Sequence, residues 1–294
     1  MNIGERIREL RISKLMTQSE LAGSRITRNM LSCIENGSAN PSLSTILYIA
    51  GRLNVPAGFL LAEEGDEIVY RKISNLSNIK RAYTAGDWRG CRSLCFSGCP
   101  EPDDEIGFLL AHCDAGIAVE EFQSGKLRSA CRFFDEALSY AEKTIYPTDD
   151  IEAIARVYFR YMERVSYTLY SDILDESKPL RVRADTPLVA YLDALDALER
   201  EDTETVSVFL ANTDPTAFEH AHVRSRLMMA EGEYRSAEKL LLQLLKAETP
   251  LMPVSLYEVL CELEVCCREN EDFKGAYNYA NEKVALLEQL LKEV

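Results

Sequence analysis

The chain has 294 residues, of which 47% are hydrophobic and 28% are charged, a composition typical of soluble globular proteins. This length is sufficient for two domains with buried cores. No stretch approaches about 18 uninterrupted apolar residues, and the N-terminal segment is charged from Glu5 onward, unlike a secretory signal peptide. These features favour a cytoplasmic protein that neither spans nor binds a membrane.

The net charge of −15 is distributed unevenly along the chain. Residues 1–62 carry seven basic and four acidic side chains, a net charge of +3, which leaves −18 for the remainder. A phosphate backbone would be attracted to the first segment and repelled by the second. The asymmetry therefore predicts two domains with different functions, at residues 1–66 and 67–294.

The first of these segments predicts five short helices. Asn2 with Glu5, and Thr17 with Glu20, have the spacing of a capping box, in which a side chain and its partner three residues later satisfy helix N–H groups. The pair Asn36-Gly37 can end a helix because both residues tolerate the left-handed conformation. With Thr27 and Ser42 as further caps, helices are expected at residues 3–14, 17–22, 28–35, 43–53 and 56–61.

Three strings within these helices carry a family resemblance. TQSELA, ITRNMLSCIENG and NPSLSTILYIAGRLNV occur in this order, and together they resemble the XRE (lambda-repressor-like) helix-turn-helix family. A turn about one residue shorter than usual, around Gly23 to Arg25, is the one departure. The resemblance implies that the helix from Arg28 is a recognition helix for the DNA major groove, and that Glu35 pairs with Arg11.

The polar side of the recognition helix predicts the DNA contacts. Ile26, Leu31 and Ile34 should face the core, which turns the other side outward. Arginine pairs with guanine and asparagine with adenine at major-groove edges. The resemblance assigns base or phosphate contacts to the start of this helix and a phosphate contact to the preceding glutamine. The predicted DNA-binding residues are Gln18, Arg25, Thr27, Arg28, Asn29, Ser32, Cys33 and Asn36.

A single module with a charge of +3 neutralises few phosphates and would bind weakly. Two modules spaced by one helical turn read a palindrome with added affinity. We therefore expect a homodimer that binds double-stranded DNA at a palindromic operator. The alternative is a degenerate module that serves only for dimerisation.

Residues 67–294 predict an all-α domain built of repeats. Five segments share a helix end, a polar turn, a large residue and a small residue three places later, which resembles tetratricopeptide-like (TPR) repeats. Five helical hairpins are expected to stack into a right-handed solenoid with a concave groove; the middle one is irregular because a helical pattern runs from Asp150 to Glu176. The position of the large repeat residue is aromatic in three segments, is Leu127 in a fourth and is Thr203 in a weaker fifth. With their partners three places later, the pairs are Trp88 and Cys91, Leu127 and Ala130, Thr203 and Val206, Tyr234 and Ala237, and Phe273 and Ala276.

Two groups in this domain are candidates for contact with a peptide. A basic stripe with neighbouring tyrosines could hold the backbone and carboxylate of a peptide, and a second pair lies on the inner face expected from the repeat. The alternative is that the arginines pair with acidic neighbours while the tyrosines lie in the core. The candidates are Arg156, Arg160, Arg164, Tyr161 and Tyr167, followed by His222 and Arg226.

The C-terminal helix, expected at 273–291, either caps the solenoid or forms a dimer contact. Cys91, Cys95 and Cys99 stand four residues apart and favour buried packing positions over a metal site. No nucleotide-binding, metalloprotease or kinase motif is present. We therefore predict no cofactor, no metal site and no enzymatic activity; metal chemistry at the cysteines would be the basis of the opposing interpretation.

A helix-turn-helix followed by TPR-like repeats resembles the RRNPP-type regulators of Gram-positive bacteria. The resemblance implies quorum sensing, in which a short peptide binds the concave face and changes how the dimer holds DNA. The alternative is a regulator whose repeats bind a partner protein or only mediate oligomerisation.

Overall fold

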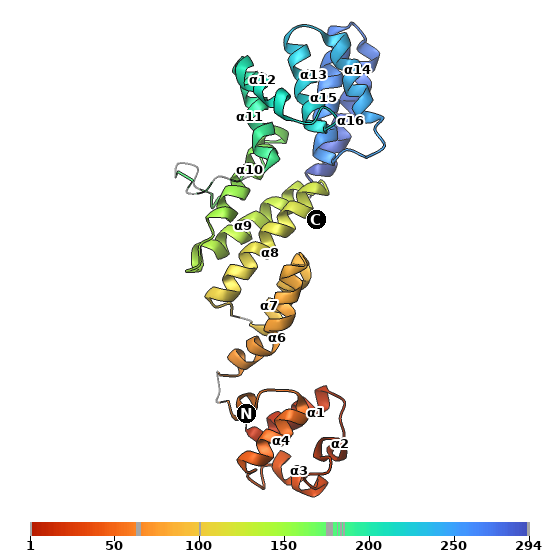
Figure 1. Ribbon diagram of the computed structural model, residues 1–294. Coiled ribbons are helices and arrows are strands. Elements are labelled where there is room, and N and C mark those ends of the chain that lie inside the picture. Colours follow the sequence, from red (N-terminus) through yellow and green to blue (C-terminus); the bar gives the residue numbers. More distant parts are fainter. Residues whose placement is uncertain are drawn as a thin grey trace. The chain divides into compact units, whose positions relative to one another are not determined.

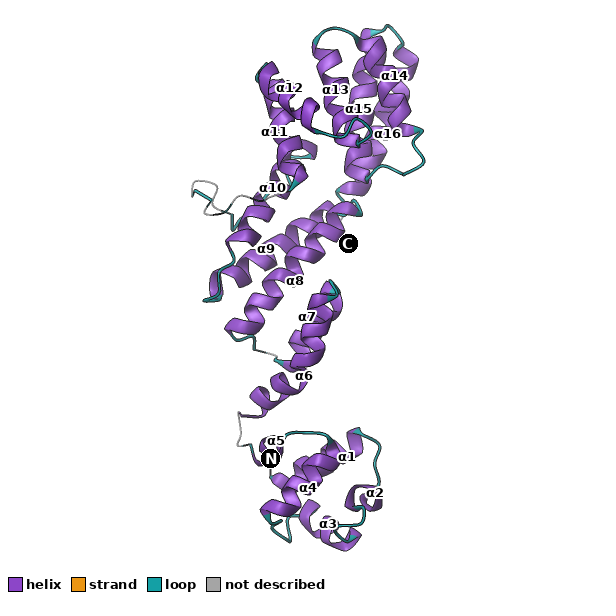
Figure 2. Cartoon of the chain, viewed as in Figure 1, coloured by secondary structure: helices purple, strands orange, loops and turns teal. Residues whose placement is uncertain are grey.

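The structure is a computed structural model that describes residues 2–62, 66–99, 101–174, 179–180, 182, 184 and 186–292. Throughout these ranges every regular element is an α-helix (Figures 1 and 2), which confirms the predicted all-α class. The contacts divide the chain into two compact units, residues 1–106 and 107–294. No helix in the described ranges is long and apolar enough to cross a membrane.

The N-terminal bundle of the first unit has its own core. Ile7, Leu21, Leu31, Ile49 and Leu53 are fully buried in it, one or more from each of the first four helices. Burial of such side chains contributes about 1.5–3 kcal/mol each, and this holds five short helices together. The helices are α1 (Ile3–Ser13), α2 (Gln18–Ala22), α3 (Arg28–Glu35), α4 (Leu43–Leu53) and α5 (Ala57–Leu61).

The predicted caps begin these helices. Asn2 and Glu5 exchange hydrogen bonds of 2.9 Å in each direction, and Thr17 forms the same box with Glu20. Thr27 and Ser42 accept bonds from the backbone at α3 and α4, which confirms both predictions.

The end of α3 differs from the prediction in one respect. Gly37 adopts a left-handed φ of +71°, but Asn36 has an ordinary φ of −91°. A single left-handed residue is enough to close the helix, so Asn36 keeps its side chain on the exposed side of α3.

Eleven further helices occupy the rest of the described chain. Ten of them form five antiparallel hairpins, as predicted, and α10 lies between the second and third hairpins without a hairpin partner (Figure 1). The hairpins are α6 (Asp66–Thr84) with α7 (Trp88–Gly98), α8 (Asp104–Gln123) with α9 (Leu127–Lys143), α11 (Pro187–Glu199) with α12 (Thr203–Asn212), α13 (Phe218–Ala230) with α14 (Tyr234–Leu245), and α15 (Pro253–Glu269) with α16 (Phe273–Leu290); α10 is Asp149–Val165.

The five hairpin turns share a backbone feature. In each turn, the residue two places before the large repeat residue has a left-handed φ between 60° and 81°. The small residue three places after the large one is fully buried in the first four hairpins, because it lies where the two helices approach closely. The left-handed residues are Gly86, Gly125, Glu201, Gly232 and Glu271.

The predicted long helix from Asp150 is wrong in its extent. Helix α10 ends at Val165, and Ser166 is extended with φ −158°. The Ser166 hydroxyl accepts a bond from the backbone N–H of Thr168 at 3.3 Å, and such local side-chain bonds compete with helix formation. Residues 175–178, at the far end of that prediction, lie outside the described residues.

Candidate nucleic-acid interface

Helix α3 separates its apolar and polar residues as predicted. Leu31 and Ile34 are buried against the other helices of the bundle. Arg28, Asn29 and Cys33 are exposed on the outer side, while Ser32 is half-buried. The outer side therefore presents a guanidinium and a carboxamide at the first turn of the helix, where both can reach an external ligand.

The same side of α3 carries a residue that the sequence reasoning missed. Met30 is 40% exposed, and its backbone N–H donates to Thr27 Oγ1 at 3.1 Å. The sequence did contain a sign of this exposed residue, because Met30 is apolar but does not share the helical spacing of the buried residues Leu31 and Ile34. In contact with DNA, an apolar side chain of this kind suits the methyl group of thymine.

The turn between α2 and α3 fixes Arg25. Gly23 is left-handed, with φ +55°, and a Cβ there would lie 2.4 Å from the hydroxyl of Tyr48. That hydroxyl donates to the carbonyl of Ala22 at 3.0 Å, and the Arg25 guanidinium lies 5.7 Å from the centre of the Tyr48 ring. The shortened turn thus requires glycine, and Arg25 is placed over α4 while it remains exposed.

A buried carboxylate joins α1, α2 and α3. Glu35 accepts from Arg11 at 2.7 and 2.9 Å, as the family resemblance implied, and from Nε2 of Gln18 at 2.8 Å. Burial alone would raise the pKa of Glu35, but the hydrogen bonds from Arg11 and Gln18 and the nearby positive charges outweigh it and lower that pKa. Glu35 is therefore an ionised anchor, and it holds the side chain of Gln18 at the start of α2.

The arrangement of α2 and α3 agrees with the comparison to known families. Residues 7–60 match the family described as Helix-turn-helix. This segment is a helix-turn-helix DNA-binding domain.

A curated relative matches a short stretch of the chain. The immunity repressor protein of Bacillus phage phi105 is 37% identical over 65 residues. The match covers 22% of this chain and 45% of that protein, so it spans less than half of the relative's own length.

Two solved structures were also found across the whole chain. PlcR of Bacillus thuringiensis, crystallised with the peptide PapR7 and DNA, is 12% identical, with 99% of each chain covered and a TM-score of 0.23. The apo form of the competence regulator ComR of Streptococcus vestibularis is 16% identical, covers 99% of this chain and 93% of its own, and has a TM-score of 0.24. TM-scores this low do not establish a common arrangement, so the assignment of the helix-turn-helix domain rests on residues 7–60.

The basic stripe of the second unit is engaged in ion pairs. Arg160 on α10 binds Asp193 at 2.8 Å and Asp196 at 2.6 Å, both on α11. Arg164 reaches Asp196 at 3.3 Å, Glu199 at 2.9 Å and, on α15, Glu258 at 3.9 Å. Arg156 pairs within α10 with Glu152 at 2.6 Å. This is the ion-pair alternative weighed for the stripe, and it leaves these arginines largely committed to neighbouring helices.

The tyrosines beside the stripe lie in two different environments. Tyr161 is buried, and its hydroxyl donates to Glu258 at 2.7 Å. Burial also raises the pKa of the half-buried Tyr158. Tyr167 is 88% exposed and follows the end of α10, so it does not extend the helical stripe as the sequence suggested.

The second predicted group, His222 and Arg226 on α13, joins the first one. His222 is fully buried, with Nδ1 2.7 Å from the hydroxyl of Tyr191 and Nε2 2.9 Å from Glu262. Arg226 Nε lies 3.5 Å from the same carboxylate. Through Glu258 and Glu262, side chains of α10, α11, α13 and α15 thus form one polar cluster. The sequence reasoning missed both glutamates, although their spacing of four residues inside an apolar helix was a signal.

The nine cysteines all lie in described parts of the chain and form no disulfide. Cys91, Cys95 and Cys99 are buried, in keeping with the predicted packing role. Burial raises the pKa of Cys131 and of Cys266 to about 12, which suppresses the reactive thiolate. Across the described ranges, no three or more His, Cys, Asp or Glu side chains are placed to hold a metal ion.

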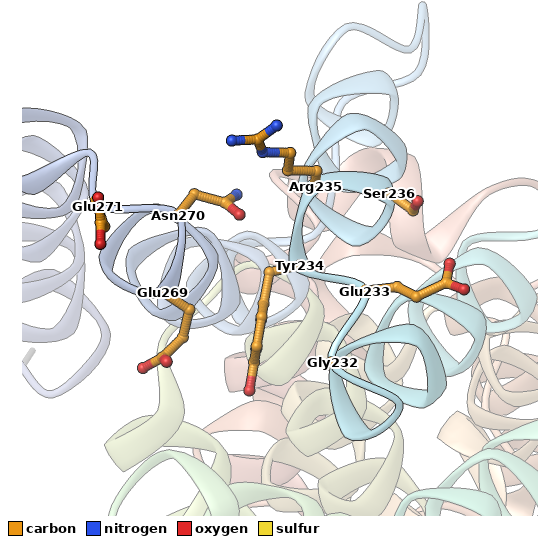
Figure 3. Close-up of a pocket in the computed structure, with 8 residues that line it drawn as sticks. All are labelled: Gly232, Glu233, Tyr234, Arg235, Ser236, Glu269, Asn270 and Glu271. Atoms are coloured by element: carbon orange, nitrogen blue, oxygen red, sulfur yellow. The ribbon is translucent and has the colours of Figure 1, made fainter.

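A surface hollow of about 420 Å³ lies between the turns of the last two hairpins. Figure 3 shows the side chain of Tyr234 extending between Glu269 and Gly232, with Asn270 and Arg235 above it. Asn270 donates to Glu238 at 2.8 Å. The lining is polar and of mixed charge, so the hollow has no evident ligand preference.

Proposed function

We propose that this protein is a transcriptional regulator that binds a specific DNA sequence through α3. The observation that carries the proposal is the outer side of α3, where Arg28 and Asn29 are exposed at the first turn of a helix whose inner side is fixed in the core. Arg28 would read guanine and Asn29 adenine. Thr27, Ser32, Cys33 and Asn36 lie on or beside the same side and would add base or phosphate contacts.

Gln18 and Arg25 would contact the phosphate backbone. The Gln18 amide has one N–H directed to Glu35, and its carbonyl oxygen and second N–H are not used in that bond. The N-terminus of α2 adds backbone N–H groups that suit a phosphate oxygen. Arg25 is exposed above Tyr48, which restricts its conformations before DNA binds.

We further propose that residues 1–66 bind DNA, whereas residues 67–294 supply dimerisation and control in the cytoplasm. A charge of +3 on one module is too small for tight binding, and a dimer on a palindrome provides a second module. A short peptide bound by the repeats would act by favouring one arrangement of the paired modules over another. The ion pairs of Arg160 and Arg164 favour a peptide site elsewhere than on the basic stripe.

The test is the substitution Arg28→Ala in the full-length protein. A duplex selected from a random DNA pool by the wild-type protein should bind about 5- to 150-fold more weakly to the variant, since a bidentate base contact is worth about 1–3 kcal/mol. Arg235→Ala is the control, because it removes the same charge from an exposed position on α14. Equal discrimination between the selected and random duplexes by wild type and Arg28→Ala would refute the proposal.

The second candidate is a regulator whose repeats bind a partner protein and no peptide. The exposed apolar residues of α16, such as Tyr277 at 69%, favour a protein contact on the last hairpin. An operator affinity that responds to a co-purifying protein, and to no peptide, would support this candidate.

A further inference from the structure

A cavity of about 640 Å³ lies between α11, α12 and the start of α13 in the second unit. This is within the usual range of small-ligand pockets, about 300–1,000 Å³. Its apolar part includes Ala190 of α11 together with Val208 and Phe209 of α12. Val208 is 56% exposed, so a hydrophobic surface faces the opening.

The polar part of the cavity is acidic. Asp193, Asp214 and Glu219 line it, and none of the described lining residues is Lys, Arg or His. Arg160 neutralises Asp193, but no salt bridge joins Asp214 or Glu219 to a basic side chain of the described chain. Among the described residues, these two carboxylates line the cavity without a salt bridge, and the nearest basic influence on Asp214 is the ring of His220.

Local bonds fix the wall that carries Asp214. The backbone N–H and the hydroxyl of Thr216 both donate to Asp214 Oδ1 at 2.8 Å, and these two bonds lower the pKa of Asp214. Oδ2 takes no part in them. At the end of α12, next to Asp214, the hydroxyl of Thr213 donates to the carbonyl of Phe209 at 2.8 Å. The carboxylate is thus ionised and held in place before any ligand arrives.

We propose that this cavity binds the free amino terminus of a short peptide whose first side chain is apolar. The ammonium group pairs with Glu219 and Asp214, and the first side chain packs on Val208 and Phe209. A hydrogen bond between an ionised donor and an ionised acceptor is about twice as strong as a neutral one. The proposal rests on the peptide-controlled function above and identifies the end of the peptide that the repeats recognise.

The probes are the dipeptide amide Phe-Leu-NH₂ and its N-acetyl derivative, in the full-length protein at pH 6.5. The free α-amino group is charged at this pH, and acetylation removes that charge without removing the side chains. Titrations followed by ligand NMR should give a dissociation constant at least tenfold lower for the free amine. Equal affinity for both probes would overturn the proposal.

Two variants locate the site. Glu219→Gln should weaken the free amine at least fivefold and leave the acetylated probe unchanged, while Val208→Arg, which fills the exposed mouth, should abolish binding of both probes. Glu204→Gln is the matched control, because this exposed glutamate on α12 does not line the cavity. Unchanged binding in Val208→Arg, with its helical spectrum intact, would place the probes elsewhere and overturn the assignment.

Operator binding measured on the same samples separates this inference from the proposed function. If the probes bind as described while the wild-type protein enriches no duplex from the random pool, the regulator proposal fails and the cavity assignment stands. If the duplex binds and the probes do not discriminate, only the cavity assignment fails.

Discussion

His222 Nε2 lies 2.9 Å from Glu262 Oε1, and the histidine side chain has no exposed surface. On the other side of the ring, Nδ1 is 2.7 Å from the hydroxyl of Tyr191, which also lies 3.2 Å from Glu258 Oε2. A neutral imidazole has one N–H. If that N–H is on Nε2, Nδ1 accepts the hydrogen bond of the Tyr191 hydroxyl. The Tyr191 oxygen then has no proton to donate to Glu258.

With the proton on Nδ1 instead, the lone pair of Nε2 would face the Glu262 carboxylate. The imidazolium suits all three contacts, because its charge pairs with the Glu262 carboxylate, Nδ1–H donates to the Tyr191 hydroxyl and the Tyr191 proton goes to Glu258. Tyr161 and Arg164 of α10 meet Glu258 as well, and Ser225 and Arg226 of α13 meet Glu262. Burial lowers the pKa of His222, but the charge of Glu262, its hydrogen bond and the charge of Glu258 raise it further, so the net shift is upward.

The raised pKa of His222 predicts a pH-dependent stability. A group with a raised folded-state pKa contributes fully below its unfolded value, about 6.5, and the contribution is lost as the pH rises through the folded-state value. His222→Gln should therefore destabilise the protein by about 2–3 kcal/mol at pH 6 and by less at pH 9. Urea unfolding of both proteins across this range measures the difference, and a pH-independent difference would contradict the imidazolium assignment.

Glu35 predicts the opposite pH dependence in the helix-turn-helix domain. Its pKa is lowered, so its contribution is present above the unfolded value, about 4.3, and is lost as the pH falls through the folded-state value. Glu35→Gln leaves Arg11 without its anion and should cost about 3 kcal/mol, the lower end of the range for broken buried pairs.

Hydrogen exchange of the α1–α3 amides at pH 7 reports that loss directly, and Glu9→Gln, which changes an exposed glutamate of α1, is its control for charge. Because Glu35 also holds Gln18, operator affinity should fall in Glu35→Gln more than in Glu9→Gln. Unchanged exchange rates in Glu35→Gln would show that the pair does not stabilise this domain.

Helix starts and turns could be predicted from the sequence where residues close in the chain determine them. Caps such as Thr27 and the repeat turn before Trp88 depend on residues within about four positions, and the structure confirms them. The end of α10 was missed because the apolar and aromatic pattern continues to Tyr170. The helix ends at Val165 instead, because the hydroxyls of Ser166 and Thr168 form local hydrogen bonds directly after it. These bonds outweigh the apolar and aromatic pattern.

The contacts between distant helices were not predictable in the same way. Arg160 and His222 were identified as separate candidates because spacing reports only what shares one helix. Their partners Asp193, Asp196 and Glu262 come from other helices, and which helices meet depends on packing. The ion pair between Glu35 and Arg11 could be predicted only because the family resemblance implied it.

The left-handed turn residues give a prediction about stability. Glycine adopts this conformation without cost, whereas a residue with a Cβ is strained by about 1 kcal/mol or more. Glu271 has φ +66°, so the substitution Glu271→Gly should stabilise the protein by about 0.5–1 kcal/mol. Gly232→Ala should destabilise it by about 1 kcal/mol, and this effect comes from the backbone alone, because a Cβ at Gly232 meets no atom within 4 Å. Chemical denaturation of both variants measures the two signs, and equal signs would contradict the argument.

The last hairpin predicts how two chains associate. Its large repeat residue, Phe273, is 69% exposed, and Tyr277 and Val284 on the same helix are 69% and 52% exposed. In α16 these residues lie four and seven positions apart, so they form one apolar stripe on the helix that follows the last turn of the repeat. Such a stripe on a terminal repeat needs a cover or a polar replacement, and we expect a second copy of the chain to provide the cover.

Tyr277→Glu should therefore convert the dimer to a monomer and weaken operator binding at least about tenfold, since each chain would then bring only one module to the palindrome. The substitution removes an exposed side chain, so the thermal stability of the monomer should hardly change. Light scattering coupled to size-exclusion chromatography gives the mass. Lys274→Glu, a larger charge change at an exposed position outside the stripe, should leave the dimer intact. A dimer that persists in Tyr277→Glu at low micromolar concentration would show that α16 caps the repeats and that another surface joins the two chains.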